Sequence, residues 1–395
     1  MPKLSLNNLG QFKLPEDFLQ RRNLDPSADY WLDERDGDLI FHPCRPDAKK
    51  IYIEVTTVCN LNCQTCIRHS WADPIAHMKE ETFNKILDSI RAFPALDRVV
   101  LTSFGEPLTH PRILNMIEKL RELKLSVTIG TNGLLLNEKI SRELIRLGVN
   151  QVVVSIDGLK PETYAGIRGA QLNEVLENIE RLNTLKRQLG VVNPTLGIEF
   201  VAMKSNQEEL PGLSELSTRL GAVRTVVTNL LPYTREMNAD KLYGYEPASP
   251  FKISGGPVKP GAWVKWGVTE LPRMHYGAEQ HCRFVNDYAI VVGWDGGVSP
   301  CYALSHSYQY FTVDGVEKQV SRLTFGNVNQ ASLADIWMSE EFVHYRSEVR
   351  AFHFPSCADC DLRDTCDLRA KNEACWGYNP SCADCLWAQD IVRCP

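Results

Sequence analysis

The chain has 395 residues, a net charge of −6, 44% hydrophobic and 23% charged residues, which is ordinary for a soluble globular protein of two or three domains. No stretch approaches the roughly 18 apolar residues of a membrane span, and no basic stripe stands out, so we expect neither a membrane nor a nucleic-acid partner. The opening sequence MPKLSLNNLGQFKLPEDF has no apolar core of a signal peptide, and we therefore expect a cytoplasmic protein in a reducing compartment.

The 13 cysteines are unusual in number and in distribution. One, Cys44, stands alone in residues 1–48, an N-terminal lead-in without strong periodicity, and we interpret it as an inert thiol. Three more lie close together, and then nine follow between Cys282 and Cys394. This distribution predicts two separate metal-binding regions.

A β-rich run from Ile51 to Val55 leads into Cys59, Cys63 and Cys66, which are spaced C-x3-C-x2-C. Three thiolates in one loop after a strand can hold three corners of a cubic [4Fe–4S] cluster and leave the fourth iron without a protein ligand. An iron with an open position can bind a substrate or cofactor directly, so this spacing indicates catalysis. The alternative is a tetrahedral zinc site completed by His69.

From residue 49 to residue 231, β-rich runs alternate with segments whose apolar residues recur at helical spacing. Such α/β alternation predicts right-handed βαβ units and a parallel sheet. Six units fit a partial (β/α)6 TIM-like barrel, while the pattern alone also allows an open doubly wound sheet. The expected strands are Ile51–Val55, Arg98–Thr102, Ser126–Gly130, Gln151–Val154, Thr195–Val201 and Ala222–Thr228.

Polar residues and turn glycines follow the expected strands at their carboxyl ends, where such folds place their chemistry. Alternation along the fourth strand puts Ser155 and Asp157 on one face, where they could hydrogen-bond the hydroxyls of a ribose. Taken singly, Asn132-Gly133 and Asp157-Gly158 are also ordinary turn dipeptides. The strand-end residues are Gly105, Glu106 and Pro107 after the second strand, Asn132 after the third, Ser155 and Asp157 after the fourth, Glu199 and Met203 with the fifth, and Asn229 with the sixth.

Residues 232–281 break the alternation with prolines and glycines, and they predict a linker or lid, not another βα unit.

Residues 282–395 are predicted to form a smaller, Cys-rich α+β region. There the turn Trp294-Asp295-Gly296-Gly297 predicts a hairpin, with Cys282 before it and Cys301 on its return strand. One or two helices follow, capped by Ser332 and Ser339.

Seven further cysteines fill the tail after these helices. Paired C-x2-C motifs are typical of zinc ribbons, so zinc is an alternative for this region as well. The seven are Cys357, Cys360, Cys366, Cys375, Cys382, Cys385 and Cys394.

The stretch IYIEVTTVCNLNCQTCIRHSW, with the Gly-Glu-Pro, Asn-Gly and Ser-x-Asp-Gly elements at successive strand ends, resembles the radical S-adenosylmethionine (radical SAM) family. Two positions depart from the family pattern: Thr65 replaces an aromatic residue, and Phe104 replaces the first glycine of a Gly-Gly-Glu-Pro element. The resemblance implies the partial barrel, a [4Fe–4S] cluster on the three loop cysteines that binds S-adenosylmethionine, and Glu106 as a partner of its amino group. It also implies reductive cleavage to a 5′-deoxyadenosyl radical, with an electron donor such as ferredoxin or flavodoxin.

The C-terminal cysteines resemble SPASM, the auxiliary-cluster domain of radical SAM maturases, in Cys282, in the Gly296-x4-Cys301 hairpin and in the C-x2-C-x5-C run from Cys357 to Cys366. This resemblance implies two auxiliary [4Fe–4S] clusters with four ligands each and one spare cysteine. By analogy, Cys282 and Cys301 bind the nearer cluster and the later run binds the distal one. Ala370 stands where the family usually has a further cysteine, so the remaining ligands stay unassigned.

Three stretches, CNLNCQTCIRHSW, VTNLLPYTREM and CWGYNPSCADCLWAQDIVRCP, resemble the radical SAM maturases of tungsten-containing aldehyde oxidoreductases. This implies an oxidoreductase whose partner is a tungstopterin enzyme or its cofactor. A peptide-modifying maturase of the sulfatase or ribosomal-peptide type is the alternative within the class. A non-catalytic, zinc-stabilised binding protein is the alternative outside it. We expect the Arg68–Trp71 segment to face the substrate, and Tyr302 and Asp287 to be candidate acid–base residues.

Overall fold

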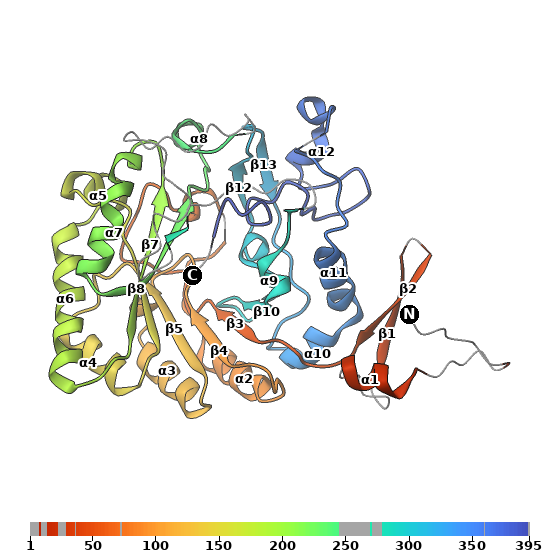
Figure 1. Cartoon of the computed structure of the whole chain (residues 1–395), viewed down its shortest axis with the longest axis horizontal. Helices are drawn as coiled ribbons and strands as arrows, with labels where there is room; N and C mark the ends of the chain where they lie inside the picture. Colours follow the sequence, from red (N-terminus) through yellow and green to blue (C-terminus); the bar gives the residue numbers. More distant parts are fainter. Residues whose placement is uncertain are drawn as a thin grey trace.

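The computed structural model describes residues 8, 14–22, 29–35, 37–71, 73–244, 269–270, 279–358 and 360–393. Its centre is a nine-stranded sheet in the order β11-β10-β3-β4-β5-β6-β7-β8-β9 (Figure 1). Neighbouring strands pair in parallel from β10 to β9, and β11 runs antiparallel to β10. The strands are β3 (Lys50–Ile53), β4 (Arg98–Leu101), β5 (Ser126–Thr131), β6 (Gln151–Ser155), β7 (Thr195–Ala202), β8 (Ala222–Asn229), β9 (Thr269–Glu270), β10 (Ala289–Val292) and β11 (Val298–Ser299).

The six strands β3 to β8 are the six expected from the sequence, and their ends agree to within two residues. Helices between them cover the outer face of the sheet, as Figure 1 shows for α3, α4, α6 and α7. The α/β partial barrel is therefore confirmed. The helices and short 3-10 turns of this region are η1 (Ile67–Ser70), α2 (Glu80–Ile90), η2 (Pro107–Thr109), α3 (Ile113–Glu122), α4 (Glu138–Arg146), α5 (Pro161–Arg168), α6 (Leu172–Leu189), η3 (Gln207–Glu209), α7 (Leu210–Arg219) and α8 (Arg235–Asp240).

Alternation along the strands sorts their side chains into two separate cores. Val99 and Leu101 of β4 are fully buried against the outer helices, in the large core that also holds Phe83 and Ile86 of α2. Val100, between them, points to the opposite face and packs in a second core with Tyr52 and Tyr302. Because Tyr302 belongs to the C-terminal region, that region packs against the inner face of the barrel sheet.

The sheet is longer than the sequence indicated. Residues 232–281 were expected to be a linker or lid, yet the described part contains α8 and β9, and β9 pairs in parallel with β8. The expectation of no further βα unit is therefore wrong. A two-residue strand leaves no periodic signal, and the prolines and glycines around it predict loop. At the other edge, β10 of the C-terminal region pairs in parallel with β3.

The C-terminal region is the expected smaller α+β unit. Its hairpin forms around Gly296, which has φ +87°, but β11 ends at Ser299, so the expectation that Cys301 lies on the return strand is wrong. The Ser332 side chain caps the following helix by accepting a hydrogen bond from the Asp335 backbone N–H, whereas Ser339 makes no such bond. The elements are α9 (Arg283–Asn286), η5 (Tyr302–Leu304), β12 (Tyr308–Phe311), β13 (Glu317–Val320), α10 (Leu333–Met338), α11 (Glu340–Ala351), η6 (Arg363–Thr365) and α12 (Asp367–Ala370).

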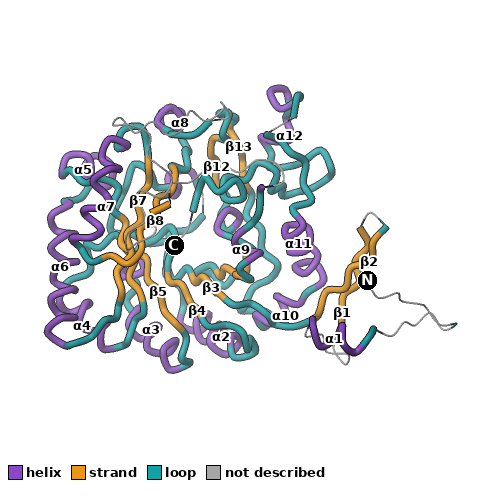
Figure 2. Tube along the Cα trace, in the orientation of Figure 1, coloured by secondary structure: helices purple, strands orange, loops and turns teal. Residues whose placement is uncertain are grey.

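The last described residues return to the barrel, and Figure 2 shows the C terminus between the barrel strands and the C-terminal elements. The Arg393 backbone N–H donates to Thr228 Oγ1 over 2.8 Å, and the Asn229 N–H donates to the Ile391 carbonyl over 3.2 Å. These bonds fix the tail to the carboxyl end of β8. The tail therefore lies at the edge of the sheet where the cysteine loop also begins.

The N-terminal segment was expected to lack pattern, but it contains α1 (Glu16–Arg22) and a hairpin of β1 (Tyr30–Arg35) and β2 (Asp38–Pro43). The hairpin lies at the outer edge of the molecule beside α10 and α11 (Figure 1). Trp31 fastens it there by donating from Nε1 to the Met338 carbonyl over 2.9 Å. Cys44 follows β2 in a loop. No described helix is long and apolar enough to span a membrane.

Candidate functional site

A cavity of about 260 Å³ opens at the carboxyl ends of the barrel strands. The cysteine loop forms one wall, the ends of β4 to β8 form the floor, and the C-terminal tail contributes the remaining side. The lining includes Cys59, Cys63, Cys66, Arg68, Phe104, Gly105, Glu106, Asn132, Ser155, Arg168, Glu199, Asn229, Tyr302, Trp387 and Arg393. Most strand-end residues expected from the sequence therefore meet in one place.

Arg68 and backbone N–H groups hold the cysteine loop in shape. The Arg68 guanidinium donates to Cys66 Sγ over 3.1 Å, to the Thr57 carbonyl over 3.2 Å and to the Leu61 carbonyl over 3.0 Å. The Leu61 N–H in turn donates to Cys59 Sγ over 3.4 Å. Donors to sulfur stabilise thiolates and cluster ligands, so the loop is built for thiolate chemistry.

Two of the three loop thiols, those of Cys59 and Cys63, are harder to ionise than a free cysteine. Burial raises the pKa of both Cys59 and Cys63. The Leu61 N–H partly offsets the rise in the pKa of Cys59, and the charge of Arg168 partly offsets the rise in the pKa of Cys63. A bound metal group deprotonates such thiols outright. The environment of the loop therefore fits a metal cluster better than free cysteines.

A single zinc ion completed by His69 does not fit the loop. His69 Nε2 donates to the Cys63 carbonyl over 3.1 Å, and its ring lies 5.9 Å from that of Tyr233, outside the lining of the cavity. Across the described residues, three or more His, Cys, Asp or Glu ligand atoms converge to within 4.8 Å only at Asp33, His344 and Glu348. The three loop sulfurs are thus spread more widely than the ligands of one ion, as a cluster with several metals requires.

Gly105 and Glu106 follow β4 and take strongly constrained positions. A Cβ on Gly105 would lie 2.2 Å from the Thr56 carbonyl oxygen, so only glycine fits there. The buried Glu106 carboxylate accepts hydrogen bonds from the Leu108 N–H, the Asn132 N–H and Thr131 Oγ1 over 2.7–3.0 Å. Three of its roughly four lone-pair positions are thus filled, leaving one for a ligand. Burial raises the pKa of Glu106 to about 7 against these bonds.

Asn132 connects the end of β5 to the cysteine loop. Its side-chain amide donates to Asn60 Oδ1 over 2.8 Å and reaches Cys59 Sγ at 3.9 Å. Pro107 has a different position from the one the sequence indicated. It begins η2, is buried, and does not line the cavity.

Ser155 lines the cavity, but Asp157 does not, so the expectation that both face one ligand is wrong. The strand ends at Ser155, and strict alternation of side chains ends with it. Asp157 is fully buried instead: Oδ2 accepts from Arg168 over 2.6 Å and Oδ1 accepts from the Val201 N–H over 2.9 Å. Asp157 therefore holds Arg168, which does line the cavity.

Glu199 of β7 lies on the cavity wall as well, and burial raises its pKa to about 7, with the Asp157 charge adding to the shift. Met203 lies past the end of β7 in a small buried core and does not line the cavity. Asn229 does line it, and its side chain donates to the Ile391 carbonyl over 3.1 Å. The tail is thus bonded directly to the cavity floor.

Arg68 of the Arg68–Trp71 segment lines the cavity, and so does Tyr302, one of the two candidate acid–base residues. Tyr302 donates from its hydroxyl to the Thr102 carbonyl over 2.5 Å. Trp71 points away and packs against Phe104 and His306, with ring centroids 5.4 and 4.0 Å apart. Asp287, the other candidate acid–base residue, is exposed just after α9 and does not line the cavity.

The nearer C-terminal cysteines gather from two distant parts of the chain. Cys282, Cys301, Cys382 and Cys385 line one small buried pocket, together with Trp387 and Tyr345. The Tyr345 hydroxyl lies 3.7 Å from Cys382 Sγ. Burial raises the pKa of all four thiols, so this pocket too calls for a cationic group.

Four of the other tail cysteines, Cys357, Cys360, Cys366 and Cys375, do not line this pocket, although Cys357 packs in the same buried cluster as Cys382. Cys357 is buried, and burial, with the charge of Asp384 adding to it, raises the pKa of its thiol to about 12. Cys366 is half-buried, while Cys360 and Cys375 are exposed. Cys394 lies outside the described residues. A buried ionic network of Lys318, Asp384, Arg369 and Asp314 borders Cys357.

Sequence reasoning missed Arg168, Trp387 and Arg393. None of them belongs to a motif at a strand end. Arg168 is the last residue of α5. Trp387 and Arg393 belong to the C-terminal tail, which follows the end of β8 by more than 150 residues. The available signal was the position of this Trp and Arg in CLWAQDIVRCP, the end of a stretch that carries the resemblance to the tungsten maturases.

Two family models match separate parts of the chain. Residues 53–200 match the family model of the radical SAM superfamily, and residues 282–361 match that of SPASM, an iron–sulfur cluster-binding domain. The chain is 37% identical over 355 residues to the tungsten-containing aldehyde ferredoxin oxidoreductase cofactor-modifying protein of Pyrococcus furiosus, covering 88% of this chain and 97% of the relative.

Two solved structures share the fold at low identity. SuiB of Streptococcus suis, bound to the precursor peptide SuiA, aligns with a TM-score of 0.58 and 17% identity, over 82% of this chain and 72% of SuiB. Native anSMEcpe, with bound AdoMet and the Cp18Cys peptide, aligns with a TM-score of 0.53 and 16% identity, over 86% of this chain and 95% of that chain. The chain therefore belongs to the radical SAM enzymes with a SPASM domain, in the family of the tungsten-containing aldehyde ferredoxin oxidoreductase cofactor-modifying protein.

Proposed function

We propose that the chain is a maturase that modifies the cofactor of a tungsten-containing oxidoreductase, or that enzyme itself. In this proposal Cys59, Cys63 and Cys66 bind the [4Fe–4S] cluster that binds S-adenosylmethionine. The observation that carries the assignment is the single cavity in which these sulfurs face the ends of β4 to β8. Three sulfurs in that cavity leave one iron for the co-substrate.

The bound cluster and S-adenosylmethionine supply a one-electron reductive cleavage that yields a 5′-deoxyadenosyl radical. The protein holds the co-substrate and excludes water. Glu106 offers its remaining lone pair to the amino group, next to the Asn132 amide, which also steadies the cysteine loop. Ser155 supplies a hydroxyl for a ribose, and Arg168, held by Asp157, supplies a fixed cation at the same wall.

The substrate would enter on the side formed by Phe104, Tyr302, Trp387 and Arg393. These residues combine aromatic faces with a cation, which suits a flat, anionic molecule such as a pterin phosphate. The resemblance in sequence to the Pyrococcus furiosus protein supports the tungsten enzyme as partner.

We assign Cys282, Cys301, Cys382 and Cys385 to one auxiliary [4Fe–4S] cluster, because they line one pocket. Four cysteines leave no open iron, so this site suits electron transfer and not substrate binding. Cys357, Cys360, Cys366 and Cys375 would hold the second cluster, with Cys394 as the spare. Electrons would come from a ferredoxin or flavodoxin in the cytoplasm.

Release of 5′-deoxyadenosine by anaerobically purified protein tests the cysteine assignment. With dithionite and S-adenosylmethionine, Cys59→Ala, Cys63→Ala and Cys66→Ala should each abolish release, whereas Cys44→Ala, in the loop after β2, should leave it unchanged. Undiminished release in the three loop variants would refute the assignment, and colourless protein loaded with zinc would restore the zinc alternatives.

A second experiment tests the substrate. Co-production with a tungsten-containing aldehyde oxidoreductase should change the mass of the pterin cofactor extracted from that enzyme, or of its polypeptide. The change should disappear with Cys63→Ala. If the mass changes only in an added short peptide, the peptide-modifying alternative is correct.

A further inference from the structure

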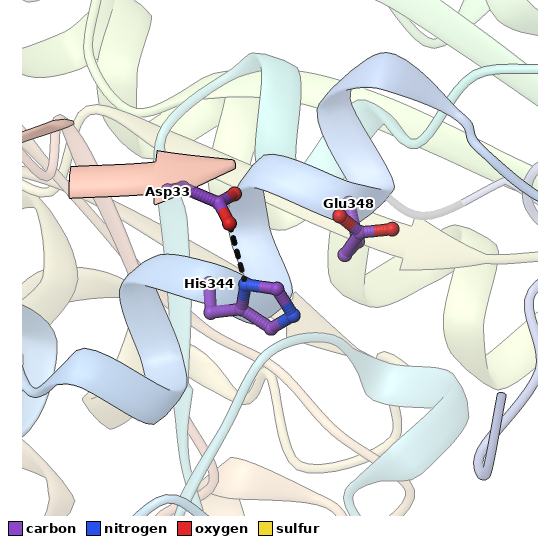
Figure 3. Close-up of side chains that lie close together, drawn as sticks. All are labelled: Asp33, His344 and Glu348. Atoms are coloured by element: carbon purple, nitrogen blue, oxygen red, sulfur yellow. Dashed lines mark ion pairs between the residues drawn. The ribbon is translucent and has the colours of Figure 1, made fainter. Parts of the chain in front are cut away.

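The N-terminal hairpin and helix α11 bring together three side chains that carry metal-ligand atoms. We propose that Asp33, His344 and Glu348 form a binding site for a divalent transition-metal ion of the Zn²⁺ type, separate from the sulfur sites. Figure 3 shows the three side chains turned toward a shared space between β1 and α11. Among the described residues, this is where His, Cys, Asp or Glu ligand atoms converge to within 4.8 Å of one another.

The backbone sets this arrangement before any ion binds. His344 and Glu348 are four residues apart on α11, and residues at that spacing project from the same face of a helix. Asp33 comes from β1, and its Oδ1 lies 3.6 Å from His344 Nδ1 (Figure 3). Ligand atoms on a tetrahedral zinc ion lie roughly 3.4 Å apart, given metal–ligand distances near 2.1 Å. Side-chain adjustments of about 1 Å would therefore close the site.

A second layer of side chains orients the carboxylates. The Tyr378 hydroxyl donates to Glu348 Oε2 over 2.5 Å and itself contacts His353 Nδ1 at 2.8 Å. His42 Nε2 lies 3.6 Å from Asp33 Oδ2, on the strand that pairs with β1. Metal ligands are usually held by such outer contacts, which fix their direction and raise their basicity.

The donor set and its exposure select the class of ion. One imidazole with two carboxylates suits Zn²⁺ and related first-row ions, and the set contains no sulfur that would favour a cluster. Asp33 and Glu348 are nearly buried, whereas the His344 side chain is 60% exposed, so an ion can enter from solvent and complete its coordination with water. Two carboxylates near each other also repel, and a bound cation relieves that repulsion.

The position of the site indicates a structural role. Asp33 is on the hairpin at the edge of the molecule, and α11 carries Tyr345, whose hydroxyl lies 3.7 Å from Cys382 Sγ. An ion shared by β1 and α11 would fasten the hairpin to the helix that borders the nearer C-terminal cysteine pocket. The Trp31 bond to the Met338 carbonyl alone makes a weaker connection.

Zinc binding by the anaerobically purified, cluster-containing protein tests the proposal. After removal of loose metal with a chelator, the protein is dialysed against buffered Zn²⁺, and bound zinc and the melting temperature are measured. The parent protein should bind one zinc beyond any background and melt at a higher temperature with zinc. His344→Ala and Asp33→Asn should each weaken that binding about tenfold or more and abolish the rise in melting temperature.

Glu138→Gln is the matched control, because Glu138 is an exposed helical carboxylate whose partner Arg142 is also four residues away. It should bind zinc as the parent does. Equal zinc binding by the parent, both site variants and the control would overturn the proposal. If His344→Ala fails to accumulate, Asp33→Asn decides the outcome by itself. Release of 5′-deoxyadenosine should be unaffected, so failure here is distinguishable from failure of the proposed function.

Discussion

Arg68 donates a hydrogen bond from Nε to Cys66 Sγ across 3.1 Å, two residues along the same loop. The same guanidinium also binds the carbonyls of Thr57 and Leu61, on both sides of Cys59. One side chain therefore spans the loop that carries all three candidate cluster ligands. Its planar, forked group can make these bonds together, which a lysine ammonium on a flexible stem cannot reproduce.

Arg68→Lys should retain the positive charge but lose the planar set of bonds. Hydrogen bonds to charged groups contribute about 1.5–3 kcal/mol each, so we expect at least about a tenfold fall in the rate of 5′-deoxyadenosine release. Iron analysis should show reduced occupancy of the loop cluster. Arg142→Lys, on the exposed face of α4, is the control and should match the parent. Equal rates in both variants would show that Arg68 is not needed to shape the loop.

Gly105→Ala should destabilise the protein, because the new Cβ would lie 2.2 Å from the Thr56 carbonyl oxygen, a backbone atom that cannot move freely. Overpacking of this kind costs about 3 kcal/mol. Gly166→Ala in α5 is the paired control, since nothing lies within 4 Å of its Cβ position, and it should stabilise the helix by about 0.5–1 kcal/mol. Calorimetry should therefore show the two melting temperatures moving in opposite directions.

Ser155→Ala and Asp157→Ala should have different effects, although the sequence predicted that both residues contact the same ligand. Ser155 lines the cavity, so its variant should weaken S-adenosylmethionine binding and leave the melting temperature nearly unchanged. Asp157→Ala leaves Arg168 buried without its carboxylate, which costs about 3–5 kcal/mol and should lower the melting temperature sharply. If both variants weakened S-adenosylmethionine binding and lowered the melting temperature to the same extent, the two residues would not have the separate roles of ligand contact and support of Arg168.

His306 should make the stability of the protein depend on pH. Its two ring nitrogens face carboxylates, Nδ1 to Asp73 over 2.7 Å and Nε2 to Glu54 over 3.0 Å. Burial opposes the charged ring, but these bonds prevail and raise the pKa of His306 above its usual 6.5. The stability that this group contributes is fully present below pH 6.5 and is lost as the pH rises through the higher folded-state pKa.

The free energy of unfolding should therefore fall between pH 6.5 and the folded-state pKa of His306, measured by denaturant titration at several pH values. His306→Gln keeps a polar side chain but cannot titrate, so it should be less stable at pH 6 and should lose most of this slope. A slope that survives unchanged in the variant must come from other groups.

The sequence by itself determined the barrel and its cysteine loop. Local apolar patterns with periods of about two and 3.6 residues specify β3 to β8 and the helices between them, because burial acts on each segment separately. Motifs whose members lie within a few residues of one another, such as Cys59-x3-Cys63-x2-Cys66 and Gly105-Glu106, can be recognised from the sequence alone, because the residues that act together are neighbours in the chain. Their placement at strand ends followed from the parallel topology.

Only the tertiary structure decided which distant groups meet. Cys382 and Cys385 join Cys282 and Cys301 from about 100 residues away, and the last turns of the tail reach the cavity at Arg393. Asp157 turned out to hold Arg168 because the strand ends two residues earlier, which no alternation rule could foresee. Spacing along the chain encodes contacts within one element, whereas contacts between elements depend on how the packed layers bring them together.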